Sequence, residues 1–393
     1  MKIIQSLLDT DYYKLTMGMV VFNRFPDVNV KYEFKCRNQT IEFTPELCWE
    51  ITDAVNQFCQ LRFKKEEIDY LATIPYFKKS YLEFLRLYQP NINHIKVHSD
   101  GNMGLAIDIE GPWFTTIYYE VPLLAIVNEV VFKAKHDKAT AYIAGEKNLA
   151  EKLTFLRECE TPFTFMDFGT RRRYSCEWQY NVVKTILNDE IVARRFFGTS
   201  NVMLAKEFGV KPVGTMAHEF LMAAQALTRI SESQKFAFQT WAEEYRGDLG
   251  IALSDVVGMD AFLRDFDLYF SKLFDGARHD SGDPLVWGDK LVEHYKRMKI
   301  DPMTKLAVFS DGLTFLKIAE IAKYFEGRIR CSFGIGTDLT NDLVDKPLNI
   351  VIKLVKTNGR PVAKISDSPG KQMCKDQGYL EYLSKVFNIK LKD

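Results

Sequence analysis

From residue 163 onward, short apolar runs alternate with longer stretches in which apolar residues recur with the period of a helix. Each apolar run ends in small or polar residues before the next helical pattern begins. This alternation predicts βαβ units and a parallel sheet. We expect strands in seven runs, at 163–167, 195–197, 211–213, 250–253, just before 278, 306–309 and 330–333.

Helical patterns follow most of these runs. Ser231 and Gln234 have the spacing of a capping box, which predicts a helix continuing through Tyr245. Because every unit places its polar residues after the strand, seven successive units favour an irregular, TIM-like α/β barrel, in which those residues converge on one pocket. The other helices are expected near 174–188, 202–208, 260–274, 285–298 and 313–325.

The two ends of the chain have a different pattern. Residues 28–36 alternate apolar and polar positions, as a half-exposed strand does. Asn358-Gly359 is a strong hairpin signal between the apolar runs 348–355 and 362–365. These features predict an α+β, sandwich-like domain built from both chain ends, with the barrel inserted between them. The expected segments are 1–112, 113–344 (the barrel) and 345–393, with N-terminal helices near 46–60, 65–73 and 78–87.

Composition excludes several classes of protein. The 393 residues carry 52 basic and 52 acidic side chains, so no net charge attracts nucleic acid or an anionic membrane. The seven cysteines form no C-x-x-C pair, which argues against a disulfide framework or a structural zinc site. The N-terminus lacks a signal-peptide pattern, and no uninterrupted apolar stretch approaches the ~18 residues of a membrane span. We expect a soluble, cytoplasmic protein.

The run Arg278-His279-Asp280-Ser281-Gly282-Asp283-Pro284 is the strongest local signal of chemistry. It follows an apolar stretch and precedes an amphipathic one, so its polar groups are expected at the carboxyl end of a strand, where they suit a phosphate and metal site. The alternative is a helix N-cap, with Ser281 or Asp283 as cap and Pro284 in the first turn. Capping does not explain Arg278 or Asp280.

Other strand ends carry matching groups. Arg171, Arg172 and Arg173 oppose the dipole at a predicted helix start, a conflict that an anionic ligand removes. The backbone of Gly334-Ile335-Gly336-Thr337 suits a phosphate, although such glycine pairs are often plain turns. His218 follows a predicted strand and suits a base, a ligand or a nucleophile toward phosphorus. The carboxylates expected at strand ends, some of which could hold Mg²⁺, are Asp255, Asp280, Asp283 and Asp311.

Taken together, these motifs resemble those of nicotinate phosphoribosyltransferases, type II phosphoribosyltransferases of NAD salvage. The resemblance extends over essentially the whole chain, and the order of the motifs makes it specific. The matching motifs are Leu8–Lys14, Gly111–Trp113, Glu120–Leu124, Asp167–Arg173, Phe197–Asn201, Gly214–Glu219, Arg278–Pro284, Ser332–Thr337, Lys346–Lys353 and Ser366–Lys371.

The resemblance implies transfer of phosphoribose from phosphoribosyl pyrophosphate to nicotinate, coupled to ATP hydrolysis through phosphorylation of His218, with Mg²⁺ as cofactor. It implies a homodimer with shared active sites, in which Tyr13 of one subunit and Phe168 of the other sandwich the pyridine ring. The remaining implied roles are Arg171 and Arg278 at the carboxylate and phosphates, Asp280 at the ribose, Asp255 as a catalytic residue, Gly334, Gly336 and Thr337 at the 5′-phosphate, and Thr199, Ser200, Asp311 and Gly312 as further substrate-binding residues.

Ser200 separates nicotinate from its closest rival. Enzymes of the related nicotinamide branch carry an acidic residue at this position, which would repel a carboxylate substrate, so serine favours nicotinate. The alternatives are a nicotinamide or quinolinate phosphoribosyltransferase and, more remotely, a metal-dependent phosphohydrolase that uses Asp255, Asp280 and Asp311. No H-E-x-x-H motif or dense ligand cluster supports the hydrolase.

Overall fold

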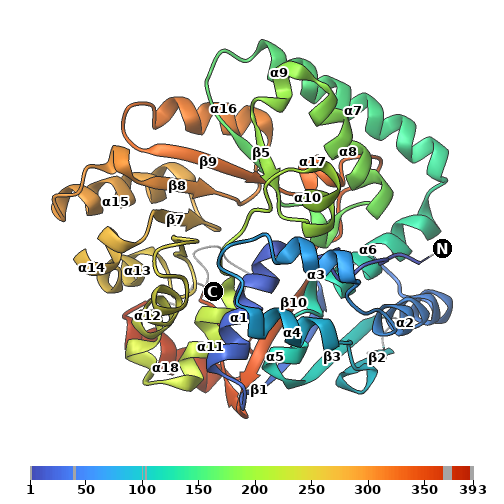
Figure 1. The fold of residues 1–393 in the computed structure, drawn as a ribbon, viewed down its shortest axis with the longest axis horizontal. Coiled ribbons are helices and arrows are strands. Elements are labelled where there is room, and N and C mark those ends of the chain that lie inside the picture. The colour runs from blue at the N-terminus through green and yellow to red at the C-terminus, as the bar shows by residue number, and fades with distance from the viewer. Residues whose placement is uncertain (1, 39–40, 100, 102–103, 366–373, 390–393) are drawn as a thin grey trace.

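The protein is described here by a computed structural model, which covers every residue except 1, 39–40, 100, 102–103, 366–373 and 390–393. Two sheets organise the chain (Figure 1). The larger is a six-stranded sheet in the order β5-β4-β9-β8-β7-β6, and all its neighbouring strands are parallel. Its strands are β4 (Phe165–Asp167), β5 (Phe196–Thr199), β6 (Ile251–Leu253), β7 (Gly276–His279), β8 (Leu306–Phe309) and β9 (Arg330–Ile335).

The parallel α/β arrangement is therefore confirmed, whereas a closed TIM-like barrel is not. Among the residues that the structure describes, no ladder joins β5 to β6, which are the two edges of the sheet. The predicted strand at 211–213 forms only an isolated bridge, between Pro212 and Thr199 of β5. Two residues later, the Thr215 hydroxyl donates to the carbonyl of Ile251 in β6 at 2.9 Å. This segment thus lies between the two edge strands.

The smaller sheet is antiparallel, in the order β11-β10-β1-β3-β2, and joins the two ends of the chain as predicted. The N-terminal strand β1 pairs with the C-terminal strand β10, for example at Tyr32 and Leu354. Residues 362–365 continue beyond the short β11 and are not a strand, contrary to the prediction. The strands are β1 (Asn29–Cys36), β2 (Ile95–Ser99), β3 (Leu105–Pro112), β10 (Ile350–Thr357) and β11 (Arg360–Pro361).

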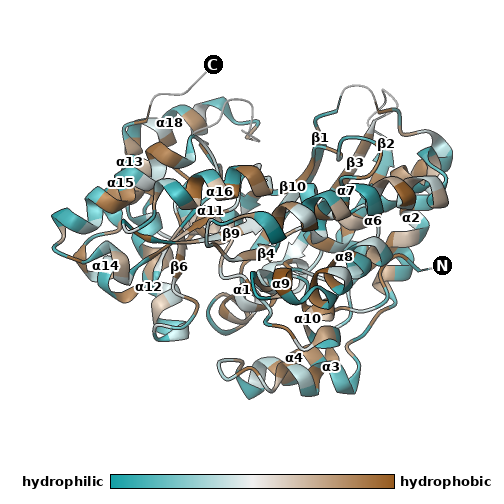
Figure 2. Cartoon of the chain, turned by 90° about the horizontal axis from the view of Figure 1, so that it is seen from above, coloured by the Kyte–Doolittle hydropathy of each residue, from teal (hydrophilic) through white to brown (hydrophobic). Residues whose placement is uncertain are grey.

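Most predicted helices are present, and their apolar sides are buried. In α15 the buried residues Trp287, Leu291, Val292 and Tyr295 recur with a helical period, and Figure 2 shows hydrophilic and hydrophobic residues mixed along such helices. The helices are α1 (Tyr12–Arg24), α2 (Pro45–Cys59), α3 (Lys65–Leu71), α4 (Lys79–Leu87), α5 (Trp113–Thr116), α6 (Glu120–Lys135), α7 (Lys138–Glu158), α8 (Cys176–Asn188), α9 (Glu190–Ala193), α10 (Val202–Phe208), α11 (His218–Leu227), α12 (Ser233–Tyr245), α13 (Met259–Asp265), α14 (Leu268–Leu273), α15 (Pro284–Arg297), α16 (Phe315–Tyr324), α17 (Thr337–Thr340) and α18 (Gln377–Phe387).

Two helix predictions are wrong in detail. Helix α12 begins at Ser233 rather than after a capping box at Ser231, because the amide group of Gln234 bonds instead to Asp265 at 2.7 Å. The single helix expected over 260–274 is two helices, since the Asp267 side chain caps a new start by accepting from the backbone N–H groups of Tyr269 and Phe270.

One stretch, Trp113–Lys135, is long and apolar enough to cross a membrane by composition, but 83% of its most apolar window is buried inside the protein. It spans α5 and α6. Helix α6 packs against α2, β10 and the turn at Thr170–Arg172. The stretch is therefore placed as a core helix, and it links the antiparallel sheet to a turn that carries predicted site residues.

Candidate active site

Helix α11 begins at the centre of the candidate site. Its first residue, His218, lies beside Asp255, which follows β6, and Asp280, which follows β7. Nε2 of His218 is 2.8 Å from Oδ1 of Asp255 and 3.5 Å from Oδ2 of Asp280. Three residues that are far apart in sequence therefore meet at the carboxyl ends of β6 and β7, as the sequence predicts.

The run from Arg278 to Pro284 is divided between the site and the following helix. Ser281 donates its hydroxyl to Oδ2 of Asp255 at 2.7 Å, and Asp280 accepts from the Ser310 hydroxyl at 3.0 Å. Asp283 caps α15 by accepting from two backbone N–H groups, with Pro284 as the first helical residue. The prediction of Ser281 as a cap is wrong, because its hydroxyl is used in the site.

One member of this cluster, Lys364, was not predicted from the sequence. Its Nζ lies 2.8 Å from Nε2 of His218 and forms an ion pair with Asp255, and its side chain is only 6% exposed. The residue stands among the apolar residues of the run 362–365, which was expected to be a strand of the other domain. The signal in the sequence that could have indicated a site residue was a lysine within an apolar run, because lysines are rarely buried without a partner.

The charges in this cluster shift one another's pKa. Burial would raise the pKa of the Asp255 carboxyl, but the Lys364 ammonium and then His218 outweigh it and hold that pKa well below its ordinary value. Burial also opposes ionisation of Asp280, yet His218 and Arg278 lower its pKa. Burial first, and the Lys364 charge second, lower the pKa of His218. At neutral pH the cluster therefore holds two carboxylates and a neutral imidazole.

Arg278 and His279 have different roles although they are neighbours. The buried His279 ring packs against Trp287 and Phe309, with ring centroids 5.4 and 5.8 Å away, so it belongs to the core. Arg278 is half-buried, and its Nε is enclosed without a hydrogen-bond partner among the residues that the structure describes. A guanidinium N–H group left without an acceptor suits an anionic ligand.

Phe168, whose backbone is hydrogen-bonded to the parallel sheet, offers an aromatic ring. It follows β4, and its backbone N–H donates to the carbonyl of Ile335 in β9 at 2.8 Å. The ring lies directly over Gly334, where a Cβ atom would be 2.2 Å from Cδ2 of Phe168. Glycine at 334 is therefore needed for the close approach of the ring, a reason that differs from the predicted phosphate contact.

Tyr13 and Arg171 lie near each other within one chain. Arg171 is 43% exposed, and its guanidinium is 3.5 Å from the Glu120 carboxylate. Burial is the main cause that raises the pKa of Tyr13 well above its ordinary value, while the Arg171 charge acts in the opposite direction. Lys14 lies 5.6 Å from the centre of the Tyr13 ring. The donation of Tyr13 across a dimer interface stays a prediction, since the structure holds a single chain.

Ser200 and Thr199 are buried and already hydrogen-bonded. Ser200 is 3% exposed and donates its hydroxyl to Oδ1 of Asp11 at 2.6 Å. The carboxyl of Asp11, itself 2% exposed, has a pKa raised by burial, against the lowering effects of Arg171 and Ser200. Thr199 is fully buried and donates to Asp167 at 2.7 Å. Position 200 carries no acidic residue, but its serine thus contacts the carboxyl group of Asp11, from the N-terminal end of the chain.

The residues predicted to hold the 5′-phosphate lie at the end of β9, and two further predicted substrate-binding residues follow the neighbouring strand β8. Gly334 lies within β9, Gly336 and Thr337 come directly after it at the start of the short helix α17, and Asp311 and Gly312 follow β8 after Ser310. Because β8 and β9 are parallel neighbours, these two ends lie at the same edge of the sheet. Gly312 has a φ of +58°, which favours glycine there.

Comparison with known proteins agrees with this arrangement. A model of the nicotinate phosphoribosyltransferase (NAPRTase) family matches residues 163–391, and a model of the N-terminal domain of that family matches residues 8–128. The chain belongs to the nicotinate phosphoribosyltransferase family. It is 49% identical over 395 residues to a nicotinate phosphoribosyltransferase of Acidovorax sp. strain JS42, covering 98% of this chain and 99% of that protein. The counterpart from Acinetobacter baumannii is 50% identical over 402 residues, covering 100% and 98%.

Solved structures support the same family. A nicotinate phosphoribosyltransferase from Vibrio cholerae superposes with a TM-score of 0.93 at 38% identity, covering 100% of this chain and 95% of that one. The enzyme of that name from Porphyromonas gingivalis gives a TM-score of 0.92 at 32% identity, covering 98% and 100%. The mixed fold with one parallel and one antiparallel sheet is therefore that of nicotinate phosphoribosyltransferases.

Within this nicotinate phosphoribosyltransferase fold, His218, Asp255 and Asp280 place potential metal-ligand atoms within 4.8 Å of one another. The cluster as a whole does not suit Mg²⁺, because Lys364 already contacts two of its three members and would repel a cation. Asp280 does fit: its side chain is 28% exposed, and Mg²⁺ typically needs only one or two protein carboxylates.

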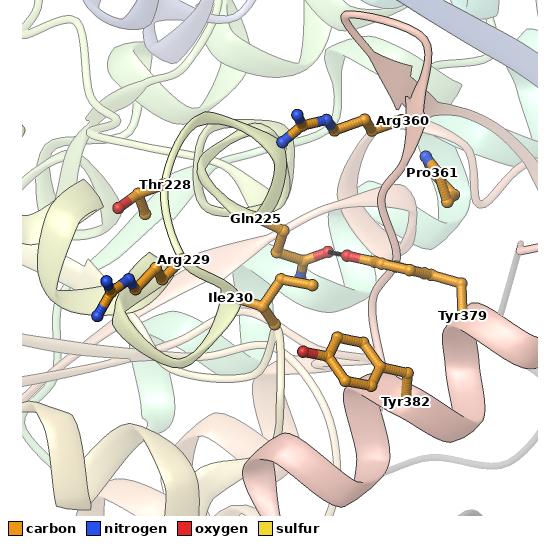
Figure 3. Close-up of a pocket in the computed structure, with 8 residues that line it drawn as sticks. All are labelled: Gln225, Thr228, Arg229, Ile230, Arg360, Pro361, Tyr379 and Tyr382. Carbon is orange, nitrogen blue, oxygen red and sulfur yellow. Dashed lines mark hydrogen bonds between the residues drawn. The ribbon is translucent and has the colours of Figure 1, made fainter.

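A surface cavity of about 550 Å³ lies at the far end of α11 from His218 (Figure 3). None of the predicted site residues lines it. Gln225, which does, also accepts a hydrogen bond from the Tyr379 hydroxyl at 2.9 Å. The lining residues are Gln225, Thr228, Arg229, Ile230, Arg360, Pro361, Tyr379 and Tyr382.

Proposed function

We propose that this chain joins nicotinate to the phosphoribosyl group of phosphoribosyl pyrophosphate, giving nicotinate mononucleotide and pyrophosphate. We further propose that ATP hydrolysis is coupled to the reaction through a phosphohistidine on His218. Family membership supports the phosphoribosyl transfer. The observation that carries the coupled part is His218, held at one ring nitrogen by Asp255 and Lys364 at the start of a helix.

The hydrogen bonds of the His218 ring support phosphoryl transfer to this residue. When Nε2 carries the proton and donates to Asp255, the lone pair lies on Nδ1, which forms no hydrogen bond with any described residue. Nδ1 attacks the γ-phosphorus of ATP, a nitrogen–phosphorus bond forms, and the bond to the bridging oxygen breaks with its electron pair leaving on ADP. Asp255 stabilises the ring as its positive charge develops. Water then attacks the phosphorus of the phosphohistidine, the nitrogen–phosphorus bond breaks with its electron pair returning to Nδ1, and inorganic phosphate leaves, which completes the hydrolysis of ATP.

The phosphoribosyl transfer itself needs no general base. The pyridine nitrogen of nicotinate attacks the anomeric carbon with its own lone pair while the carbon–oxygen bond to pyrophosphate breaks. The oxocarbenium-like transition state is favoured by the Asp280 carboxylate, and the departing pyrophosphate by Arg278. Phe168 and Tyr13 offer aromatic faces for the pyridine ring, and Arg171 offers a half-exposed cation for its carboxylate.

Several further parts of the proposal rest on the family resemblance. Mg²⁺, held by Asp280 together with substrate phosphates, would neutralise charge on the leaving pyrophosphate. Gly334, Gly336, Thr337, Asp311 and Gly312 would bind the phosphoribosyl moiety, and Thr199 and Ser200 would shape the nicotinate subsite. We propose a cytoplasmic homodimer with shared active sites, in which Tyr13 reaches the site of the other subunit.

The deciding experiment follows nicotinate mononucleotide formation with and without ATP in the wild type and in His218→Asn. We expect the variant to lose stimulation by ATP and phosphate incorporation from γ-labelled ATP, while slow product formation persists. His98→Asn is the matched control, because His98 lies on β2 with its side chain 51% exposed. Full ATP stimulation in His218→Asn would overturn the coupled mechanism, and the absence of product in the wild type would overturn the proposed transfer.

A further inference from the structure

Lys364 reaches the candidate site from a part of the chain that otherwise belongs to the antiparallel sheet. It comes three residues after β11, yet its ammonium group contacts both His218 and Asp255, which lie more than a hundred positions earlier in the sequence. The side chain is 6% exposed, and burying an ammonium group is costly unless it is paired. An ion pair with Asp255 alone would satisfy that requirement, so the second contact with the imidazole calls for its own explanation.

The backbone on both sides of Lys364 is tied to the elements that carry its two partners. On one side, the Gln225 side chain of α11 bonds twice to Ala363, accepting from its N–H at 2.9 Å and donating to its carbonyl at 2.8 Å. On the other side, the N–H of Ile365 donates to the carbonyl of Val256 at 2.8 Å. Val256 directly follows Asp255, and His218 begins the same helix as Gln225. Lys364 is therefore fixed to both structural elements at once.

The two contacts at Nε2 of His218 favour opposite positions of the ring proton. Asp255 accepts a hydrogen bond only when Nε2 carries the proton, whereas Lys364 donates only when Nε2 is bare. The ammonium group also bonds directly to Asp255, so it limits how strongly that carboxylate attracts the imidazole proton. Lys364 thus acts on the tautomer of the ring as well as on its position.

We propose that Lys364 is a positioning residue for His218, which holds the imidazole and Asp255 in one arrangement and balances the negative charge that phosphorylation adds. The charge-balancing part rests on the proposed phosphohistidine. A phosphoryl group brings about −1.5 to −2 charges at neutral pH, and the site already contains the Asp255 and Asp280 carboxylates. Lys364 is a buried cation within hydrogen-bond distance of the ring that receives this group. It takes part in no bond-making step.

The experiment compares Lys364→Met with the matched control Lys356→Met, which removes an exposed lysine of β10 from the same end of the chain. The first readout is the ¹⁵N NMR signals of the His218 ring in the protein without ligands, where Lys364→Met should shift them toward the Nε2-protonated tautomer and Lys356→Met should not. This readout does not depend on ATP, so it tests the contact even if the proposed phosphohistidine is wrong. Unchanged His218 signals in Lys364→Met would overturn the proposal.

The second readout is the amount of phosphate bound to the enzyme after incubation with γ-labelled ATP. Lys364→Met favours the Nε2-protonated tautomer, whose Nδ1 can attack phosphorus, but it also removes the cation that balances the phosphoryl charge. The amount of phosphoenzyme depends on the stability of the charged product, so we expect the second effect to outweigh the first: a reduction of about 10-fold to 100-fold in Lys364→Met and no change in Lys356→Met. Lys364→Gln keeps a donor but no charge, and it also serves if Lys364→Met does not fold. We expect low phosphoenzyme in Lys364→Gln as well, and wild-type levels in either variant would overturn the charge-balancing role.

Discussion

Replacing Ser200 by aspartate is the sharpest test of how the nicotinate subsite is built. In the structure the Ser200 hydroxyl donates to the Asp11 carboxyl at 2.6 Å, and the two side chains are 3% and 2% exposed. Ser200→Asp therefore puts a second carboxyl group against the first in a site without solvent. The sequence predicts that this change weakens nicotinate binding, and the structure predicts that it also destabilises the fold.

The loss of stability in Ser200→Asp is bounded by two costs, the repulsion between the two charges and the uptake of a proton that removes one of them. Two negative charges about 3 Å apart repel by about 5 kcal/mol at an effective dielectric constant of about 20. The pair can escape this repulsion by taking up a proton, which costs about 4 kcal/mol at pH 7 for a carboxyl of ordinary pKa. Burial already raises the pKa of Asp11, which reduces that cost, whereas loss of the serine hydrogen bond adds to it. We expect the free energy of unfolding to fall by about 3–5 kcal/mol.

The assay is urea-induced unfolding of the wild type, Ser200→Asp, Ser200→Ala and the exchanged double variant Asp11→Ser with Ser200→Asp. The exchange restores one carboxyl and one hydroxyl group, so it should recover most of the stability that Ser200→Asp loses. Ser200→Ala should lose about 1.5–3 kcal/mol, the contribution of a hydrogen bond to a charged group. If Ser200→Asp unfolds at the wild-type urea concentration, or the exchange recovers nothing, the contact between Ser200 and Asp11 is refuted.

Three further predictions concern other parts of the protein. Gly334→Ala should displace the Phe168 ring, which a Cβ would approach to 2.2 Å, and raise KM for nicotinate about 10-fold or more in steady-state assays, with a smaller effect on melting temperature. Asp9→Ala should lower the free energy of unfolding in denaturant titrations by about 3–5 kcal/mol, because it leaves the fully buried Arg173 guanidinium without its ion-pair partner. Wild-type stability of this variant would contradict the prediction. Burial of Glu244 opposes its ionisation, but its bonds to cationic partners outweigh burial and lower its pKa. The ionised carboxylate therefore stabilises the fold at any pH above its unfolded pKa of about 4.3. This stabilisation is lost as the pH falls through the lower pKa of the folded protein. Between pH 7 and pH 3 the melting temperature should therefore fall less steeply for Glu244→Gln than for the wild type.

Local pattern predicted most of the elements, and the misses have physical causes. The helices α8, α10, α15 and α16 begin and end within two residues of the expected bounds, because their apolar positions recur with a period that only a helix satisfies. The irregular, TIM-like barrel was predicted from a count of strands and is not confirmed, because the third run, 211–213, forms only one bridge, to Thr199. Pattern alone does not distinguish a strand from an extended segment.

Of the site residues, too, some could be predicted from the sequence and others could not. His218, Asp255 and Asp280 could be predicted because each follows an apolar run in a chain of βα units, and parallel strands bring such residues to one edge. The structure confirms that they meet. Lys364 could not be predicted in this way, since its position depends on bonds from Ala363 and Ile365 to two other elements.

The sequence by itself determined the alternation of strands and helices, the sharing of one sheet by both chain ends, and the family. These properties depend on local periodicity and on residue order, which the chain carries directly. Only the tertiary structure decided that Asp11 stands behind Ser200, that Ser281 bonds to Asp255 rather than capping a helix, and that Lys364 contacts His218. Such contacts join residues up to 189 positions apart, and packing of the whole chain sets which of them form.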